Sequence, residues 1–233
     1  MATVILVRHA RSTANTSGVL AGRTPGVELD GTGREQAART GERLAPVPLV
    51  TVVTSPLERC RQTAQAVVER QPRPLPTVVE EDLTECDYGR WQGRKLADLA
   101  TEELWSVVQR QPSAAVFPDG ESLLAMHARA VGAVRRIDAA VEAEHGREAV
   151  WAAVTHGDLV KAVLADALGL HLDLFQRIHV HPGSVSVVRY TPQQPHVIAM
   201  NTDAGDLGWL TAPPDTAPVG GGAGPTSPTR TGS

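Results

Sequence analysis

The sequence predicts an α/β protein: a three-layer α/β/α sandwich with a mostly parallel central sheet and a small helical cap insertion. Three short runs of β-branched and apolar residues, at 3–7, 50–54 and 149–155, have the composition of strands that are buried on both faces. A segment with helical periodicity follows each run, and strands that alternate with helices form parallel sheets covered on both sides.

The first helix is predicted at residues 32–44. Thr32 and Glu35 have the spacing of a capping box, in which each side chain bonds the backbone N–H of the other residue. Pro46 ends this helix, because proline has no N–H to donate and its ring fixes φ. The second strand, at 50–54, comes next.

The second helix is predicted from Pro56 to about Arg70, with Ser55 as its N-cap and proline in its first position. A proline-rich link then leads to a short strand at 77–80. The same criteria predict the remaining elements: a short helix at 95–109, a helix at 122–145 capped by Gly146, a helix at 158–168 closed by Gly169, and strands at 185–190 and 196–200.

We expect one domain over residues 1–210, with the mainly helical cap insertion at about 83–120. The segment 211–233 is rich in Pro, Gly, Ser and Thr and includes a run of three glycines. A chain of this composition buries too little apolar surface to offset the conformational entropy that ordering removes. We therefore expect this tail to be disordered.

The composition narrows the class of partner. With 22 Lys and Arg against 26 Asp and Glu, the net charge is −4, whereas nucleic-acid-binding proteins usually have a basic surplus. The apolar start at 1–7 lacks a charged n-region and is too short for a signal peptide or a membrane span. Cys60 and Cys86 show no disulfide or metal-binding spacing, which favours reduced thiols. We expect a cytoplasmic protein that binds neither nucleic acid nor membrane, with a homodimer as an open alternative to a monomer.

Cationic side chains follow each of the three strongest predicted strands. Arg8 and His9 follow the first, Arg59 lies in the first helical turn after the second, and His156 follows the third. The carboxyl ends of parallel strands meet at one edge of a sheet, so these side chains should converge. The helix dipole opposes an arginine in a first turn unless an anion binds there. The pattern therefore predicts an oxyanion pocket, and phosphate is the guest that suits it.

Motifs along most of the chain resemble those of a known family. They are Leu6–Asn15, Gly22-Arg23, Leu29-Asp30 to Gly33, Gln36-Ala37, Ser55–Ala64, Leu83–Gly93, Pro118–Ser122 and Thr155-His156-Gly157. In this order they resemble the motifs of the histidine phosphatase superfamily, also called the phosphoglycerate mutase-like family. The resemblance covers roughly residues 3–205, and the order of the motifs makes it specific.

The resemblance implies that His9 is the nucleophile that becomes phosphorylated and that Glu85 is the proton donor. The residues that it implies for binding the phosphoryl oxygens are Arg8, Arg59, His156 and Asn15. An unprotonated imidazole can attack phosphorus, arginines and a second imidazolium can stabilise the transferring group, and a carboxylic acid can protonate the leaving oxygen. This chemistry needs no metal or other cofactor. The HxH pair of His179 and His181 lacks an evident third ligand for a metal.

Two positions depart from the family pattern. Ala10 stands where the family usually has glycine, and Arg11 stands where it often has glutamate or glutamine. Arg11 either adds a contact to the substrate or faces solvent. With Gly22 and Arg23 it makes up the candidate substrate-binding set. Among the tryptophans, Trp91 is the candidate for a place at the pocket mouth, since it follows the acid-bearing motif.

The predicted function is metal-independent hydrolysis of a small-molecule phosphomonoester through a phosphohistidine. One alternative is a phosphomutase of the phosphoglycerate mutase type. Such mutases carry a longer insertion with basic and tyrosine residues between the acid and the second histidine, whereas the segment between Glu85 and His156 is short and has no tyrosine beyond Tyr88. A second alternative is a non-catalytic phosphate sensor on the same fold. The chain contains all the catalytic residue types of the family, which argues against this alternative.

Overall fold

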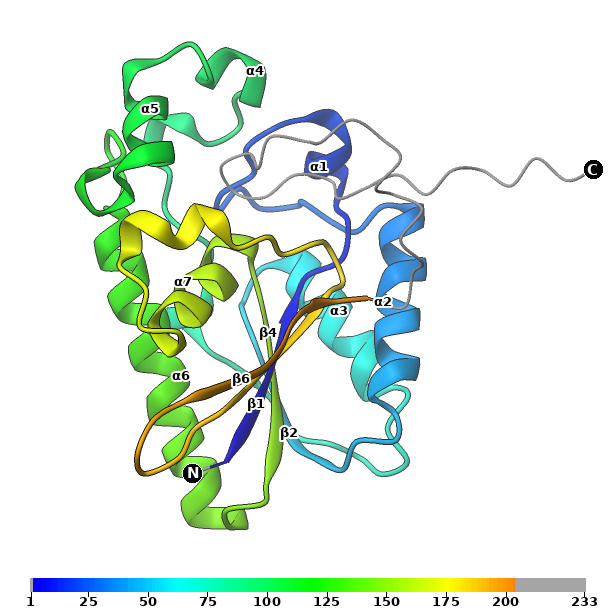
Figure 1. Ribbon diagram of the computed structural model, residues 1–233. Helices are drawn as coiled ribbons and strands as arrows, with labels where there is room; N and C mark the ends of the chain where they lie inside the picture. The colour runs from blue at the N-terminus through cyan, green and yellow to red at the C-terminus, as the bar shows by residue number, and fades with distance from the viewer. Residues whose placement is uncertain (1, 204–233) are drawn as a thin grey trace, which may run out of the picture.

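The computed structural model describes residues 2–203, which form a six-stranded sheet with helices on both faces (Figure 1). The strands are β1 (Thr3–Arg8), β2 (Leu49–Thr54), β3 (Thr77–Val79), β4 (Val150–Thr155), β5 (Val185–Arg189) and β6 (His196–Thr202). Their order across the sheet is β3-β2-β4-β1-β5-β6. The first four strands run parallel, and β5 and β6 pair antiparallel to their neighbours. The predicted α/β fold with a mostly parallel sheet is confirmed.

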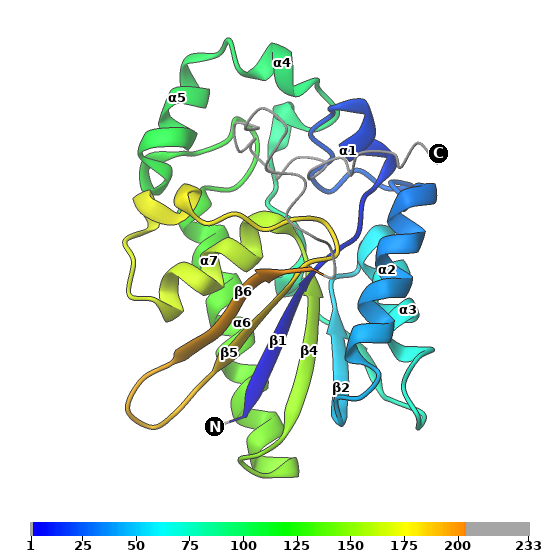
Figure 2. The same ribbon diagram turned by 45° about the vertical axis from the view of Figure 1, so that its right-hand side comes forward.

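Four longer helices make the outer layers. Helices α2 (Gly31–Leu44) and α3 (Glu58–Val68) cover one face, and α6 (Leu123–His145) and α7 (Gly157–Ala167) cover the other (Figures 1 and 2). The remaining helices and 3₁₀ turns are α1 (Thr13–Ser17), η1 (Glu81–Leu83), η2 (Gly89–Trp91), α4 (Leu96–Leu99), α5 (Glu103–Arg110), η3 (Pro112–Ala114) and η4 (Leu172–Arg177). Helices α1, α4 and α5 lie beyond the carboxyl ends of the parallel strands.

Strand β1 lies inside the sheet, and its position explains the unbroken apolar run. Val4 and Leu6 belong to the core on the α6–α7 side, and Ile5 and Val7 belong to the core on the α2–α3 side. All four side chains are at most 5% exposed. Burying such a side chain contributes about 1.5–3 kcal/mol, so both faces of the strand stabilise the sandwich.

The parallel strands bring their carboxyl ends to one edge of the sheet. Arg8 pairs with Thr155 between β1 and β4, and Thr54 pairs with Val154 between β2 and β4. The segments that follow these three strands therefore start side by side, as the strand-end argument predicts.

Two predicted helix starts are wrong. Asp30, not Thr32, caps α2, because its carboxylate accepts the N–H of Gly33 at 2.7 Å. Ser55 does not cap α3: its hydroxyl lies 2.8 Å from Nε2 of His156, and the helix begins later. In the second case a contact with another strand end replaces the local cap.

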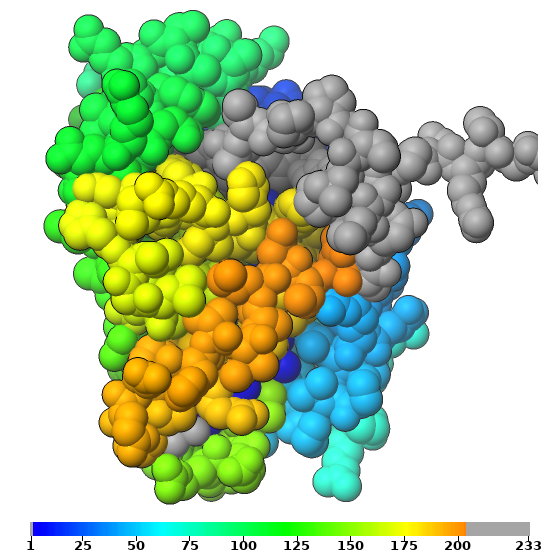
Figure 3. All heavy atoms as spheres, viewed as in Figure 1, coloured from blue at the N-terminus to red at the C-terminus, as the bar shows by residue number. Residues whose placement is uncertain are grey.

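The segment between η1 and α6 rises above the body of the molecule, as the green region of the space-filling view shows (Figure 3). The single helix predicted at 95–109 is instead two helices, α4 and α5, because the chain turns near Thr101, whose hydroxyl donates to the carbonyl of Asp98 at 2.7 Å. Helix α1 was not predicted either. Its signal is a capping box formed by Ser12 and Asn15.

No helix within residues 2–203 is long and apolar enough to cross a membrane. The tail predicted to be disordered, at 211–233, lies outside the described residues, as does the domain boundary predicted at 210.

Candidate active site

His9 directly follows β1, and its side chain is buried. Nδ1 lies 2.8 Å from the carbonyl oxygen of Ala10. A carbonyl oxygen can only accept, so Nδ1 carries the ring hydrogen and Nε2 keeps its lone pair. Nε of Arg59 donates toward this lone pair at 3.4 Å. Burial, together with the charges of Arg59 and Arg8, holds the pKa of His9 well below its usual value, so the ring is neutral and nucleophilic.

Backbone hydrogen bonds fix the loop that carries His9. The N–H of His9 donates to the carbonyl of Thr155 at 2.8 Å, and the N–H of Ala10 donates to the hydroxyl of Thr63 at 3.1 Å. Within residues 2–203, positive φ at a non-glycine residue occurs only at Asp119 and Asn201. Ala10 therefore occupies a position that is usually glycine in the family without backbone strain.

Arg59 lies in the first turn of α3 and is 1% exposed. Its Nη2 donates to the carbonyl of Gly22 at 2.8 Å and to Nδ1 of His156 at 3.2 Å. Its Nη1 is buried and has no hydrogen-bond partner in the described part of the chain. A buried charged donor without an acceptor costs free energy, and an anionic ligand would remove that cost. Arg59 thus points to an anion beside His9.

His156 lies between β4 and α7 and is fully buried. Because Arg59 donates to its Nδ1, the ring hydrogen is on Nε2, which faces the hydroxyl of Ser55. Burial, and then the charge of Arg59, hold the pKa of His156 well below its usual value. The predicted imidazolium is therefore a neutral imidazole among these neighbours, and the negative charge of a phosphate would raise its pKa.

Arg8 ends β1 and is 1% exposed. Its Nη1 donates to the carbonyl of Val180 at 2.7 Å. Burial lowers the pKa of Arg8 to about 10, against the opposing effects of Glu85 and Asp158, so the guanidinium keeps its charge at neutral pH. A Cβ at position 157 would come within 3.3 Å of Nε of Arg8, which explains why glycine follows His156.

Glu85 comes from the irregular segment 84–88 between η1 and η2, which we call the acid segment. One carboxyl oxygen accepts the N–H of Cys86 at 3.0 Å, and the other lies 3.7 Å from Nδ1 of His156. Burial, and then the negative charge of Asp158, raises the pKa of Glu85 to about 7, although Arg59 and other cations act against this. Near neutral pH the carboxyl can therefore both donate and accept a proton.

Three charged side chains, Arg23, Glu121 and Arg129, hold the acid segment, and we call them the acid clamp. Nη1 of Arg129 donates to the carbonyls of Asp82 and Thr84, both at 2.7 Å. Arg129 (Nη2) and Arg23 (Nε) both donate to the carbonyl of Glu85, at 3.1 and 2.8 Å. Glu121 accepts from both arginines, at 2.6 and 3.0 Å.

Arg129 and Glu121 were not predicted as site residues. Glu121 lies in the matched motif Pro118–Ser122, which is a usable signal. Arg129 lies on α6 and reaches the acid segment only through the tertiary fold. Nothing in the sequence around it marks that contact.

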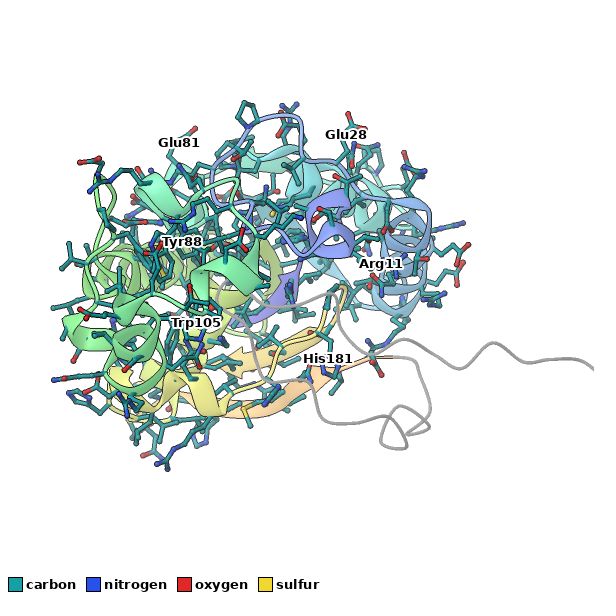
Figure 4. The ribbon with its side chains drawn as sticks, turned by 90° about the horizontal axis from the view of Figure 1, so that it is seen from above. Arg11, Glu28, Glu81, Tyr88, Trp105 and His181 are labelled. Carbon is teal, nitrogen blue, oxygen red and sulfur yellow. The ribbon has the colours of Figure 1, made fainter. Side chains whose placement is uncertain are left out.

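Two predicted site residues, Arg11 and Asn15, lie on the segment after β1 and contact residues near them in the sequence. Nε of Arg11 pairs with Asp30 at 2.7 Å. The side-chain oxygen of Asn15 accepts the N–H and the hydroxyl of Ser12, at 3.0 and 2.9 Å. In the view from above, Arg11 lies on the opposite side of the strand ends from Tyr88 of the acid segment (Figure 4).

The predicted residues thus fall into two groups. Hydrogen bonds and close contacts bring together His9, Gly22, Arg23, Arg59, Glu85 and His156, and the charge of Arg8 acts on His9 and Glu85. Arg11 and Asn15 are bonded within their own part of the chain.

Trp91 and the two cysteines were also singled out in the sequence, and only the cysteines touch site residues: Sγ of Cys60 lies 3.4 Å from Nε2 of His156, and the N–H of Cys86 donates to Glu85. Trp91 is not at a pocket mouth: it is 1% exposed, packs against Trp105 and Phe117, and donates to Glu102 at 2.9 Å. Cys60 and Cys86 are buried free thiols. Within residues 2–203 no cluster of three or more His, Cys, Asp or Glu side chains could hold a metal ion.

Comparison with known proteins gives consistent matches. The profile of the histidine phosphatase superfamily (branch 1) matches residues 4–203. A Bacillus subtilis protein named uncharacterized phosphatase PhoE is 30% identical over 169 residues, which cover 72% of this chain and 79% of that protein. The probable phosphoglycerate mutase GpmB of Proteus mirabilis is 29% identical over 216 residues, which cover 91% and 96%. The solved structure of YhfR from Bacillus stearothermophilus has a TM-score of 0.79 at 25% identity, covering 88% of this chain and 98% of that one.

The matched region spans nearly all of the described residues and contains every side chain gathered at the strand ends. The relatives include proteins named as phosphatases and proteins named as phosphoglycerate mutases. The chain belongs to the histidine phosphatase superfamily (branch 1) and is an enzyme of that family.

Proposed function

We propose that the protein is a metal-independent phosphomonoester hydrolase that works through a phosphohistidine on His9. The observation that carries this proposal is the pairing of two atoms. Nε2 of His9 presents its lone pair toward the guanidinium of Arg59, and Nη1 of that guanidinium lacks an acceptor within residues 2–203. A phosphoryl group placed there would meet a nucleophile and a cationic donor together.

In the first step, Nε2 of His9 attacks phosphorus and forms a P–N bond. The P–O bond to the alcohol breaks, and the proton of Glu85 moves to the leaving oxygen. Arg8, Arg59 and His156 stabilise the charge on the oxygens of the transferring group. We include Asn15 in the phosphate-binding set, through its amide group.

In the second step, ionised Glu85 takes a proton from water as the water oxygen attacks phosphorus. The P–N bond breaks, the lone pair returns to His9, and inorganic phosphate leaves. Glu85 is then protonated again and ready for the next ester. The raised pKa of Glu85, about 7, suits a group that alternates between acid and base near neutral pH.

We propose that the reaction needs no metal because the site already contains positive charge. The guanidinium groups of Arg8 and Arg59 already supply positive charge at the site, and both are buried. They would repel a divalent cation and can themselves stabilise the transferring group.

The phosphomutase is the second candidate, because the Proteus relative is named as one. A mutase must hold a second acidic group of its substrate with cations. In this chain, Arg94 of the cap pairs with Glu102 at 2.5 Å, and Arg90 pairs with Asp119 at 3.2 Å. These two cap cations are committed to neighbouring carboxylates, which favours the hydrolase.

The test is an assay of EDTA-treated protein on p-nitrophenyl phosphate and a panel of esters. The panel contains sugar phosphates, nucleotides, phosphoserine, a ribazole phosphate, and 3-phosphoglycerate with and without 2,3-bisphosphoglycerate. We expect metal-free phosphate release that His9→Ala abolishes and the exposed control His196→Ala retains. Interconversion of phosphoglycerates without phosphate release would instead identify a mutase.

A further inference from the structure

A buried ion pair lies behind the candidate site, in the first turns of α7. Asp158 is fully buried, and its Oδ1 accepts from Nζ of Lys161 at 3.0 Å. Lys161 is 3% exposed, also donates to Gln176 at 2.7 Å, and lies 4.9 Å from the ring centre of Phe175. Moving two charges out of water carries a desolvation cost that their attraction often fails to offset. Stability alone therefore does not account for the buried pair of Asp158 and Lys161, and its contacts point to a role in the candidate site.

The pair is bonded to the acid segment. Oδ2 of Asp158 accepts from the hydroxyl of Tyr88 at 2.8 Å, and Tyr88 lies three residues after Glu85. On the other side, the hydroxyl of Thr155 donates to the carbonyl of Leu83 at 2.7 Å. The acid segment is therefore tied at both ends to the β4–α7 junction that carries His156, so the contact can position the acid carboxyl against the phosphate-binding groups.

Asp158 also supplies the negative charge with the largest effect on Glu85. The titratable and charged groups around Glu85 are Arg8 and His9 from β1, Arg59 and Cys60 from α3, His156, Asp158 and Lys161 from the β4–α7 junction, Cys86 and Tyr88 from the acid segment, Arg129 from α6, and Arg23 and Glu121 from loops. Among the charges, Asp158 acts most strongly to keep Glu85 protonated, whereas Arg59 and Arg8 favour its ionised form.

We propose that Asp158 is a positioning residue for Glu85: through Tyr88 it anchors the acid segment, and its negative charge, balanced by Lys161, opposes the two site arginines and keeps the acid protonated before phosphoryl transfer. The inference rests on the proposed function, in which Glu85 donates a proton to the leaving group. It assigns separate tasks to the hydroxyl of Tyr88 and to the charge of Asp158.

Two single variants separate these tasks. Asp158→Asn retains an oxygen that can accept from Tyr88 but removes the charge. We expect the alkaline limb of kcat, measured on an alkyl phosphate, to move to lower pH by about one unit. Tyr88→Phe removes the tether but retains the charge, so kcat should fall while the limb stays in place. Asp166→Asn, a control on the same helix whose carboxylate pairs with Arg135 near the surface, should change neither.

A third variant guards against misfolding. Asp158→Asn alone leaves the ammonium of Lys161 without its counter-charge, whereas Asp158→Asn/Lys161→Met removes both charges together. Because Asp158, and not Lys161, is prominent among the charges that act on Glu85, the limb should move in the same direction by a smaller amount. Circular dichroism melts establish that each variant is folded at every pH used.

Glu85→Gln distinguishes the two ways to fail. If its profile loses the alkaline limb while the folded Asp158→Asn and double variants keep the wild-type limb, the role of Asp158 is wrong and the role of Glu85 stands. If the Glu85→Gln profile retains the limb, Glu85 is not the acid, and both proposals are overturned.

Discussion

The two halves of the candidate site are held by different means. His9 follows β1, Arg59 lies in the first turn of α3 and His156 caps α7, and ladder hydrogen bonds of β1, β2 and β4 set their positions. Glu85 lies in a segment without regular structure, which side chains of the acid clamp and Asp158 hold from outside. The half that we propose binds phosphate is built on the sheet, and the half that we propose moves the proton is attached to it.

This difference indicates which property each half can change. The strand ends cannot shift without breaking the sheet, so they suit groups that must meet a phosphoryl group at fixed distances. The acid segment depends on individual hydrogen bonds and ion pairs, so a single substitution there can move Glu85 or change its pKa without unfolding the core. We therefore expect substitutions at the strand ends to remove the reaction, and substitutions around the acid to adjust it.

The largest effect is expected at the centre of the rigid half. His9→Ala removes the proposed nucleophile, and phosphate release should fall to the uncatalysed background because the covalent intermediate forms on this side chain. The variant loses the bond of the imidazole to the Ala10 carbonyl, but the N–H groups of His9 and Ala10 keep the bonds that fix the loop, so the thermal melt should stay close to that of the wild type. Retained turnover in a folded His9→Ala protein would contradict the role of His9 as nucleophile.

The next largest effect is expected in the attached half. Glu85→Gln removes the proposed proton donor, and kcat for an alkyl phosphate should fall about 10²–10⁴-fold. The loss should be smaller for p-nitrophenyl phosphate, whose leaving group needs little protonation. Equal losses for both esters would contradict the acid role.

The same variant has an expected signature in stability. A pKa of about 7 in the folded protein, above the ordinary value of 4.5, means that folding favours the protonated carboxyl. The stabilising contribution of that protonated form is complete below pH 4.5 and is lost as pH rises through 7. Glu85→Gln should therefore raise the melting temperature relative to wild type at pH 8 and change it little at pH 4.

Arg59→Met tests whether a strand-end cation stabilises the transferring group. The expected loss in kcat/KM is about 10²–10³-fold, the usual effect of removing one donor to a developing charge. Arg61→Met is a matched control, because Arg61 lies on the same helix and is exposed. A loss in the control as large as that at Arg59 would point to a general effect of charge on α3.

Arg129→Met tests the clamp. Without its bonds to the acid segment, Glu85 should lose its alignment, and kcat for an alkyl phosphate should fall about tenfold to hundredfold with KM nearly unchanged. Arg136→Met is the control on α6: its guanidinium reaches the exposed carboxylate of Asp82 but none of the carbonyls that Arg129 bonds. If Arg129→Met leaves kcat unchanged, the acid segment does not depend on the clamp.

The smallest effect is expected at Arg11. Its guanidinium pairs with Asp30. Arg11→Gln should change the free energy of unfolding by about 0–1 kcal/mol, the usual range for such a pair, and should leave kcat/KM for small esters unchanged. A large rise in KM would place Arg11 in the substrate site after all.

The sequence was sufficient to predict the half of the site at the strand ends, because the strands themselves follow from the hydrophobic pattern. The runs at 3–7, 50–54 and 149–155 have the pattern of buried parallel strands, and this pattern alone brings Arg8, His9 and the residues after β2 and β4 to one edge. The position of Glu85 came only from the resemblance, since neighbouring carboxylates in its segment fit the composition equally well.

Contacts between distant elements were beyond sequence reasoning. Ser55 has every local feature of an N-cap, yet its hydroxyl contacts His156, and α3 starts later. Arg129 and Asp158 would each pass for an ordinary charged residue of a helix. Their roles depend on which chain segment the fold places against that helix, and no local pattern encodes this.

The stereochemical course of hydrolysis tests the central claim most directly. An isotopically labelled phosphorothioate ester, chiral at phosphorus, would be hydrolysed in labelled water, and the configuration of the released thiophosphate would be determined. Transfer to His9 followed by transfer to water inverts phosphorus twice, so the account predicts overall retention. Overall inversion would show that water attacks the ester directly and would contradict a phosphohistidine intermediate.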